Sequence, residues 1–332
     1  MTTPMIEVRN ISKNFVKPLD LAEKIVNIFG TGLREEVVHA VDDVSFVVAE
    51  GEVVGLVGES GCGKSTIGRI VAGILEPTAG TVLFQGHDVA RLNSDDRKKT
   101  KLKTQMIFQD PFASLNPRMR VKEIIGEAPR HHNLVPSGDI DQYVDEVMAR
   151  CGLEPGFKRR YPHQFSGGQR QRIGIARALA VRPEFLVCDE AVASLDVSIQ
   201  AQILNLFMKL RQELRLTYLF ISHDLGVVEH LSDRVIIMYL GRMVETAPAD
   251  ELFTKPNHPY TQALLAEVPR IDKRRSRYVP VKGEIPSPLD PPTGCHFHPR
   301  CPHALPRCKT EIPKLRQIAP GRFSACHLND QA

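Results

Sequence analysis

The chain has 332 residues, of which 42% are hydrophobic and 25% are charged, which is typical of a globular protein. Its 43 Lys and Arg nearly balance 39 Asp and Glu, so the net charge of +4 predicts no strong field for nucleic acid. No apolar run approaches the roughly 20 residues that a membrane-spanning helix needs. Glu7 and Arg9 lie where a signal peptide would have its apolar core, so we expect a cytoplasmic protein. Its seven cysteines are then expected to be thiols or metal ligands rather than disulfides.

In chain order, the apolar patterns predict strands that alternate with helices. Two strands, at about 6–11 and 40–48, flank an amphipathic insert at 17–36. The elements expected after them are a strand at 53–57, a helix at 66–75, a strand ending near 84, a charged helix or loop at 91–103, a strand at 105–108, broken helices over 111–162, a helix at 170–181, a strand at 185–188, a helix at 198–214, and strands at 217–221 and 235–239. This alternation indicates an α/β fold with a mostly parallel sheet covered on both faces.

A glycine-rich loop after the 53–57 strand reads Gly-Glu-Ser-Gly-Cys-Gly-Lys-Ser over residues 58–65, a complete G-x-x-x-x-G-K-S motif. Its backbone N–H groups and the start of the following helix are suited to hold phosphate. Lys64 is expected to reach the β- and γ-phosphates, and Ser65 to bind Mg²⁺. The alternative, a plain glycine turn, does not account for the Lys-Ser pair. The predicted nucleotide-binding residues of this phosphate loop are Gly58, Ser60, Gly61, Cys62, Gly63, Lys64, Ser65 and Thr66.

Two acidic residues follow the apolar strand at 185–188. Asp189 lies at the carboxyl end of that strand, where such sheets bind ligands, and is predicted to hold Mg²⁺. Glu190 is the predicted general base for the attacking water. The alternative is a pair of acids that merely caps the strand, which the presence of a phosphate loop makes less favourable.

A second glycine-rich loop, Ser166-Gly167-Gly168-Gln169, opens another predicted helix and forms a second anion site by the same helix-end physics. Together the two loops resemble the ATP-binding cassette family. The resemblance implies that Ser166, Gly167, Gly168 and Gln169 form a signature loop. Such a loop closes over ATP held by the phosphate loop of a second subunit, so the active form would be a dimer.

Three further residues carry roles that the resemblance implies. Gln109 resembles the lid-loop glutamine that contacts Mg²⁺ and the water and senses the membrane partner. His223 resembles the switch histidine at the γ-phosphate. Without the resemblance, His223 would be interpreted as an ordinary histidine at the end of a strand. Phe15 resembles the aromatic residue that stacks on adenine. Without the resemblance, Phe15 would be interpreted as a core residue. Ser194-Leu195-Asp196 resembles the loop that crosses the dimer interface.

Four stretches narrow the resemblance to ATPase subunits of bacterial oligopeptide/dipeptide importers: 109–118, 161–172, 196–205 and 258–265. Such importers often carry two ATPase subunits, and the insert after Phe15 makes this chain resemble the second of them. Ala191-Val192-Ala193-Ser194 departs from the family, which usually has a proline after the glutamate. The implied architecture is a P-loop ATPase core over 1–255, with a small antiparallel β region and a helical subdomain at about 110–175. A Cys/Pro-rich C-terminal extension follows over 256–332.

The resemblance implies an ATP-hydrolysing subunit that powers import of di- and oligopeptides across the bacterial inner membrane, bound peripherally on its cytoplasmic face. The implied partners are a second ATPase subunit in an expected heterodimer, two transmembrane permease subunits and an extracytoplasmic substrate-binding protein, with no nucleic acid. Alternatives are the same role for haem, a nickel complex, glutathione or a sugar, or a soluble ABC ATPase without a transport role.

Four of the seven cysteines lie in the extension: Cys295, Cys301, Cys308 and Cys326, with five, six and seventeen residues between them. Four thiolates suit an iron–sulfur cluster or Zn²⁺. Nearby histidines also allow a mixed Cys/His zinc site, and four unliganded thiols remain an alternative. The resemblance implies a [4Fe–4S] cluster, present in some members only. Because the extension is far in sequence from the predicted ATP ligands, we expect its role to be structural. The basic run at 273–277 is expected to be a solvated linker.

Overall fold

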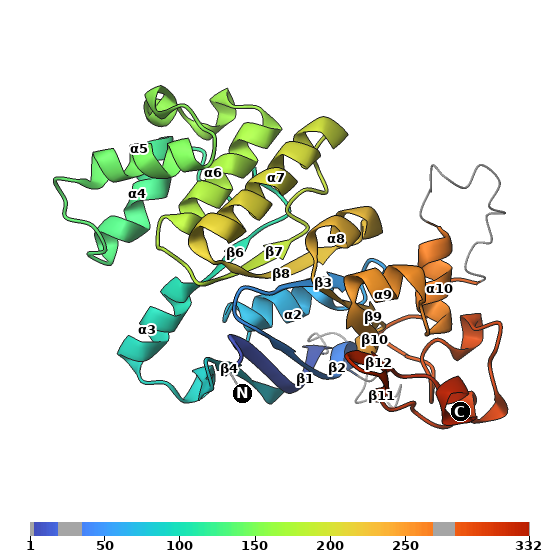
Figure 1. Ribbon diagram of the computed structural model, residues 1–332. Coiled ribbons are helices and arrows are strands. Elements are labelled where there is room, and N and C mark those ends of the chain that lie inside the picture. Colours follow the sequence, from blue (N-terminus) through green and yellow to red (C-terminus); the bar gives the residue numbers. More distant parts are fainter. Residues whose placement is uncertain (1–2, 19–34, 268–282, 332) are drawn as a thin grey trace, which may run out of the picture.

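The computed structural model describes residues 3–18, 35–267 and 283–331. Figure 1 shows a central sheet with helices above and below it, a second sheet beneath, a helical region at one end, and the C-terminal extension at the other. Most of the amphipathic insert predicted at 17–36, and the basic run predicted at 273–277, lie outside the described residues.

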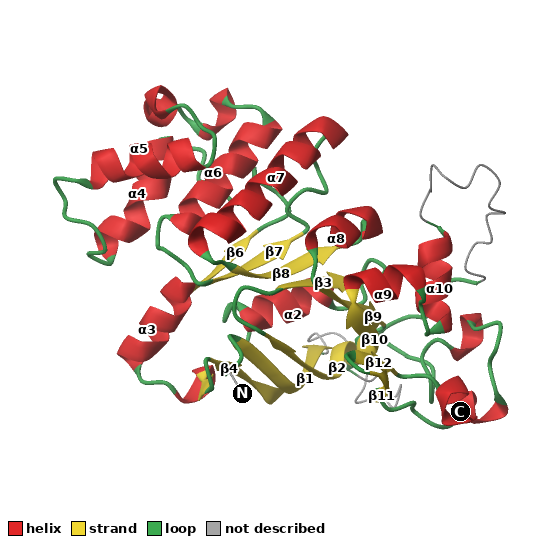
Figure 2. Ribbon diagram, in the orientation of Figure 1, coloured by secondary structure: helices red, strands yellow, loops and turns green. Residues whose placement is uncertain are grey.

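The larger sheet has eight strands in the order β11-β12-β10-β9-β3-β8-β7-β6. Its five strands from β9 to β6 are parallel, as the alternation of strands and helices predicts. The strands, drawn in yellow in Figure 2, are β3 (Val53–Val57), β6 (Thr104–Ile107), β7 (Phe185–Asp189), β8 (Thr217–Ser222), β9 (Arg234–Tyr239), β10 (Arg242–Pro248), β11 (Arg316–Ala319) and β12 (Arg322–Ser324).

Both faces of the parallel strands are buried, and successive side chains therefore enter the cores on opposite sides of the sheet. In β8, Tyr218 and Phe220 join the core beneath α6 (Gly167–Leu179) and α7 (Val197–Leu214), whereas Leu219 and Ile221 join the core around α2 (Lys64–Val71). Strands β3 and β9 therefore contain continuous apolar runs, over residues 53–57 and 235–239. The helix α2 lies between the two sheets (Figure 1).

The smaller sheet is antiparallel, in the order β2-β1-β4-β5. Its strands are β1 (Ile6–Lys17), β2 (Glu36–Val48), β4 (Ala79–Phe84) and β5 (His87–Asp88). Its buried side chains, such as Ile6 and Val44, pack with Ile67 and Ile70 of α2 in one core cluster. The sheet thus supports the helix that begins at the phosphate loop.

Between β4 and β8 the chain builds its helical region, with α3 (Ser94–Lys103), α4 (Val121–His131), α5 (Ile140–Arg150), α6 (Gly167–Leu179) and α7 (Val197–Leu214). The charged segment predicted at 91–103 is a helix without buried residues. The helix predicted from residue 170 begins at Gly167 instead, because Ser166 caps it and brings the glycines into its first turn.

The helices α8 (Leu225–Leu231) and α9 (Ala249–Thr254) precede the extension. The extension contains α10 (Pro259–Ala266) and three short 3₁₀ helices, η4 (His298–Arg300), η5 (Pro306–Lys309) and η6 (His327–Gln331). Its strands β11 and β12 join the larger sheet through β10. Within the part of the chain that the structure describes, every helix is too short or too polar to cross a bilayer.

Candidate functional site

The phosphate loop leaves the buried strand β3 and curls tightly before α2. Gly63 has a φ of 103°, and a Cβ there would lie 2.2 Å from the carbonyl oxygen of Ala40 in β2, so only glycine fits. Lys64 Nζ donates to the carbonyl oxygens of Gly58 and Glu59, at 2.6 and 3.0 Å. The ammonium group therefore lies inside the curl, where a phosphate chain would be held.

The other predicted loop residues follow this geometry. Ser60 and Gly61 are exposed at the tip, whereas the thiol of Cys62 is buried. The carbonyl of Cys62 accepts a hydrogen bond from the N–H of Gly241 at 3.0 Å, so the turn after β9 holds the loop from behind. Thr66 is partly buried in the first turn of α2.

Ser65 and Asp189 meet across the sheet edge. Ser65 Oγ donates to Asp189 Oδ1 at 2.8 Å. Burial raises the pKa of Asp189, while the bond from Ser65 and the charges of Arg69 and Lys64 oppose that rise. A hydroxyl and a carboxylate side by side are the hard oxygen ligands that Mg²⁺ takes together with substrate phosphates, so the residues present fit that ion.

Glu190 lies at the centre of a second contact group. Gln109 Nε2 donates to Glu190 Oε2 at 2.7 Å, and His223 Nδ1 lies 3.3 Å from Glu190 Oε1. Glu190 itself has a φ of 49°, and its N–H donates to the carbonyl of Ile221 at 2.9 Å. The backbone is thus fixed in the left-handed region, which directs the carboxylate toward the other two side chains.

Sheet register explains why these residues meet. Asp189 of β7 pairs with Ile221 of β8, and Val57 of β3 pairs with Ser222. Ile107 of β6 pairs with Cys188. The carboxyl ends of four neighbouring parallel strands therefore reach one edge together, which is where open α/β sheets bind ligands.

The signature loop lies elsewhere in the chain's fold. Ser166 caps α6, with its Oγ accepting from the N–H of Gln169 at 3.4 Å and Gln169 Oε1 accepting from the N–H of Ser166 at 3.0 Å. A Cβ at Gly168 would lie 2.4 Å from Ile199 Cγ2, whereas Gly167 is partly exposed. Among the described residues, 166–169 make no hydrogen bond to the phosphate loop of the same chain.

Phe15 is an exposed residue of β1, with 42% of its surface accessible and Lys13 Nζ 5.3 Å from its ring centroid. It pairs with Val38, two residues before the Ala40 whose carbonyl faces Gly63. The core-residue alternative is therefore wrong for Phe15. Its register places it on the strand pair beside the phosphate loop.

Two residues that sequence reasoning did not select contact the phosphate loop from the extension. Arg300 forms a bidentate ion pair with Glu59, with Nη1–Oε2 and Nη2–Oε1 distances of 2.8 and 3.0 Å. The N–H of Glu59 donates to Tyr260 Oη at 3.0 Å. Although the extension is far in sequence from the predicted ATP ligands, Arg300 and Tyr260 bring it into contact with the phosphate loop. Its expected structural role stays a prediction. The stretch 258–265 that carries the family resemblance was the available signal for Tyr260.

The four cysteines of the extension lie near one another. The N–H of Cys295 donates to the carbonyl of Cys308 at 2.8 Å. Burial, and then the nearby Cys308, Cys326 and Cys301, raise the pKa of Cys295 to about 11. Within 3–18, 35–267 and 283–331, no three His, Cys, Asp or Glu side chains are arranged to hold a metal ion. The cysteines are thus clustered without converging on one ion position.

Comparisons with known proteins agree with this geometry. Residues 41–193 match a family described as ABC transporter, and residues 244–308 match one described as the C-terminal region of oligopeptide/dipeptide transporters. The chain is 51% identical to the oligopeptide transport ATP-binding protein AppF of Bacillus subtilis, over 98% of this chain and 97% of that protein. It is 46% identical to a probable peptide ABC transporter ATP-binding protein, y4tS, of Sinorhizobium fredii, over 100% of this chain and 92% of that protein.

Solved structures show the same fold over about three quarters of the chain. CbiO1 of Clostridium perfringens, part of the ABC transporter complex cbiONQ, aligns with a TM-score of 0.61 and 27% identity, over 76% of this chain and 92% of that one. The ATP-binding cassette MJ0796, solved as a dimer in a post-hydrolysis state with ADP and Pi, aligns with a TM-score of 0.62 and 26% identity, over 74% and 99%.

Proposed function

Because this chain belongs to the family of ABC transporter ATPases, we propose that it is the ATP-hydrolysing subunit of a bacterial importer for di- and oligopeptides. The chain is an ABC-type ATPase. The observation that supports its catalytic role is the meeting of Lys64, Ser65, Asp189 and Glu190 at one sheet edge. The match over nearly the whole length to an oligopeptide transport ATP-binding protein supports the peptide substrate.

Each residue of the site has a proposed task in hydrolysis. Lys64 binds the β- and γ-phosphates and lowers the energy of the charge that develops on them. Ser65 and Asp189 would hold Mg²⁺, which supplies further charge neutralisation when bound. Glu190 takes the proton of the attacking water as a general base. Its contacts with Gln109 and His223 hold its carboxylate in place and make these two side chains candidates to sense the water and the γ-phosphate.

Among the described residues, the signature loop makes no hydrogen bond to the phosphate loop of its own chain, which supports a dimer in which it faces the nucleotide of the other subunit. Ser166 is exposed, as a residue that docks on a second subunit must be. Capped by Ser166 and Gln169, the start of α6 offers N–H groups and a positive helix end to a phosphate. The stacking role of Phe15 on adenine is part of the same proposal.

We place this ATPase on the cytoplasmic face of the inner membrane, bound to two permease subunits and served by an extracytoplasmic substrate-binding protein. A second, non-identical ATPase subunit completes the proposed heterodimer. The proposed contact with the permease is the segment after Gln109, where Phe112 is 62% exposed and lies against Arg170, with its ring centroid 3.6 Å from the guanidinium carbon. The proposed domains remain 1–255, with a helical subdomain at about 110–175, and 256–332.

For the cysteine cluster we propose a [4Fe–4S] centre held by Cys295, Cys301, Cys308 and Cys326. Their mutual proximity supports it, and a cluster of four irons occupies more space than one ion, so its ligands need not converge on one point. The side chains would still have to close around it, since the described residues hold no ready metal group. Anaerobic purification with iron, sulfide and zinc analysis tests this: zinc alone, or none of the three, contradicts it.

The Lys64→Ala variant tests the catalytic proposal. In the transporter assembled with its permease, we expect turnover to fall to background, while a Lys99→Ala variant on the exposed helix α3 keeps normal turnover. Normal hydrolysis by Lys64→Ala would refute the site. Uptake of labelled peptides, haem, nickel complexes, glutathione and sugars by the assembled system tests the substrate class, and transport of a non-peptide alone would refute the peptide assignment.

A further inference from the structure

Glu59, the second residue of the phosphate loop, is held on three sides. Its carbonyl accepts from Lys64 Nζ at 3.0 Å, its N–H donates to Tyr260 Oη at 3.0 Å, and its carboxylate pairs with Arg300. Lys64 belongs to the loop itself, whereas the other two partners come from the C-terminal extension. The extension therefore contacts the same residue as the phosphate-binding lysine.

The ion pair between Arg300 and Glu59 is shielded from water. The side chain of Arg300 is 6% exposed and that of Glu59 is 21% exposed. Two parallel N–H···O bonds fix both the distance and the plane of the carboxylate. Tyr239 flanks the guanidinium, with its Oη 3.4 Å from Nη1. Such a pair is stronger and more directional than an exposed one, because solvent screens it less.

The segment that carries Arg300 is itself fixed. Phe297, three residues earlier, is buried with its ring centroid 5.3 Å from those of both Tyr239 and Tyr260. His296 Nδ1 lies 3.0 Å from the carbonyl oxygen of Leu240, in the turn that also holds the loop through Gly241. The backbone segment that carries Arg300 is thus anchored close to the phosphate loop.

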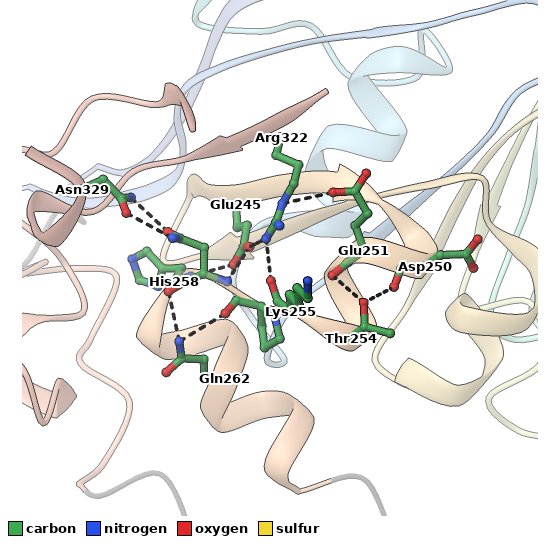
Figure 3. A network of polar contacts seen from close by, with 11 residues as sticks. Glu245, Asp250, Glu251, Thr254, Lys255, His258, Gln262, Arg322 and Asn329 are labelled. Carbon is green, nitrogen blue, oxygen red and sulfur yellow. Dashed lines mark hydrogen bonds and ion pairs between the residues drawn. The ribbon is translucent and has the colours of Figure 1, made fainter. Parts of the chain in front are cut away.

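The polar network in Figure 3 includes His258, two residues before Tyr260. Glu245 of β10, wholly buried, accepts from the N–H groups of Asn257 and His258 at 2.8 Å each. His258 Nδ1 in turn accepts from the N–H of Tyr260 at 3.1 Å and caps α10. This anchoring sets where the Tyr260 hydroxyl meets Glu59. Both contacts on the phosphate loop thus rest on fixed parts of the extension.

From these contacts we infer that Arg300 and Tyr260 are positioning residues for ATP binding, through which the C-terminal extension holds the phosphate loop in its phosphate-binding shape. The inference rests on the proposed assignment of residues 58–65 as the phosphate-binding loop. Two physical effects underlie it. Arg300 neutralises a carboxylate that would otherwise repel the nucleotide's phosphates from within the loop. Together the two contacts also restrain the peptide at Glu59, so less conformational entropy is lost when phosphate binds.

The test measures the dissociation constant of a fluorescent ATP analogue with the purified full chain, and KM and kcat for ATP in the assembled transporter. We expect Arg300→Gln to weaken binding and raise KM roughly tenfold, within the usual range of coupling between sites, while kcat changes less than about twofold. Arg300→Lys keeps the charge but loses the fork, so it should fall between Arg300→Gln and the unaltered chain.

Two matched controls separate positioning from general damage. Arg307 forms ion pairs with Glu311 and Asp330 inside the extension, away from the phosphate loop, so Arg307→Gln should leave ATP affinity unchanged. Tyr260→Phe should weaken ATP binding, whereas Tyr143→Phe, which loses a hydroxyl bond to the carbonyl of Ala180 in the helical region, should not. If Arg300→Gln does not fold by circular dichroism, Tyr260→Phe and Glu59→Gln carry the test.

A double-mutant cycle decides whether the two charges act together. If they do, the Glu59→Gln/Arg300→Gln chain binds no more weakly than Arg300→Gln alone. Additive losses, or normal ATP affinity in a folded Arg300→Gln chain, would overturn the inference. Lys64→Ala, measured in parallel, keeps the two questions apart. Normal nucleotide binding by Lys64→Ala would refute the assignment of the phosphate loop itself. Weakened binding by Lys64→Ala together with normal binding by Arg300→Gln would refute only the role of the extension.

Discussion

His258 should make the stability of this protein fall in mildly acidic solution. The imidazole is fully buried beside Phe297, with ring centroids 5.9 Å apart, and caps α10 as a neutral acceptor. Burial lowers its pKa to about 4 from an ordinary value of 6.5, against a small opposing effect of the backbone of Ala325. The folded protein therefore keeps His258 neutral where the unfolded chain would already protonate it.

The direction in which pH changes the free energy of unfolding follows from proton binding at His258. Between pH 6.5 and 4 the unfolded chain binds a proton at His258 that the folded chain does not, so falling pH favours unfolding. Full stability is present above pH 6.5. With these two pKa values, the loss in the free energy of unfolding is about 2 kcal/mol between pH 7 and pH 5, and about 3 kcal/mol by pH 4.

Urea unfolding followed by circular dichroism at pH 7 and pH 5 measures this loss. His258→Asn keeps an oxygen that can cap α10 but cannot titrate, so it should be destabilised at pH 7 and lose about 2 kcal/mol less than the unaltered chain on going to pH 5. His303→Asn, at an exposed position of the same extension, should lose as much free energy of unfolding between pH 7 and pH 5 as the unaltered chain does. Equal losses in His258→Asn and the unaltered chain would refute the burial argument.

Three further outcomes follow from the site. Glu190→Gln should keep ATP binding but slow hydrolysis by roughly 10² to 10⁴, trapping a closed dimer on size exclusion; normal turnover in the assembled complex would assign the base to another residue. Ser166→Arg, mixed with unaltered chains, should block hydrolysis at the nucleotide held by the partner subunit, and a defect only at its own nucleotide would contradict the sandwich. Gly63→Ala should weaken ATP binding more than roughly tenfold, because its Cβ meets the carbonyl of Ala40, whereas Gly138→Ala, with open space around it, should bind normally.

Much of the fold was predictable because its signals are local. A run of five apolar residues in β3 and a similar run in β7 predict strands buried on both faces, and the structure confirms both. Boundaries were less predictable where side-chain capping decides them. The α6 helix starts at Gly167 rather than at residue 170, since Ser166 and Gln169 satisfy each other's backbone groups and extend the helix through two glycines.

By itself, the sequence predicted the chemistry of the nucleotide site. A phosphate loop, an acidic pair after a strand and a capped glycine loop each work through neighbouring residues, so a short stretch of chain carries the whole signal. The family resemblance follows from the same stretches and agrees with the matched relatives.

Only the tertiary structure decided which of these groups meet. Strand order and register bring Gln109, Glu190 and His223 together from the ends of three strands. The spacing of residues along the sequence does not reveal that strand order. The tertiary structure also brought Arg300 to Glu59, 241 residues away in sequence. An ion pair depends on distance through space, and the packing of Phe297 against Tyr239 and Tyr260 holds the segment of Arg300 near the phosphate loop. The part of the chain that looked most remote from the phosphates is therefore in direct contact with their loop.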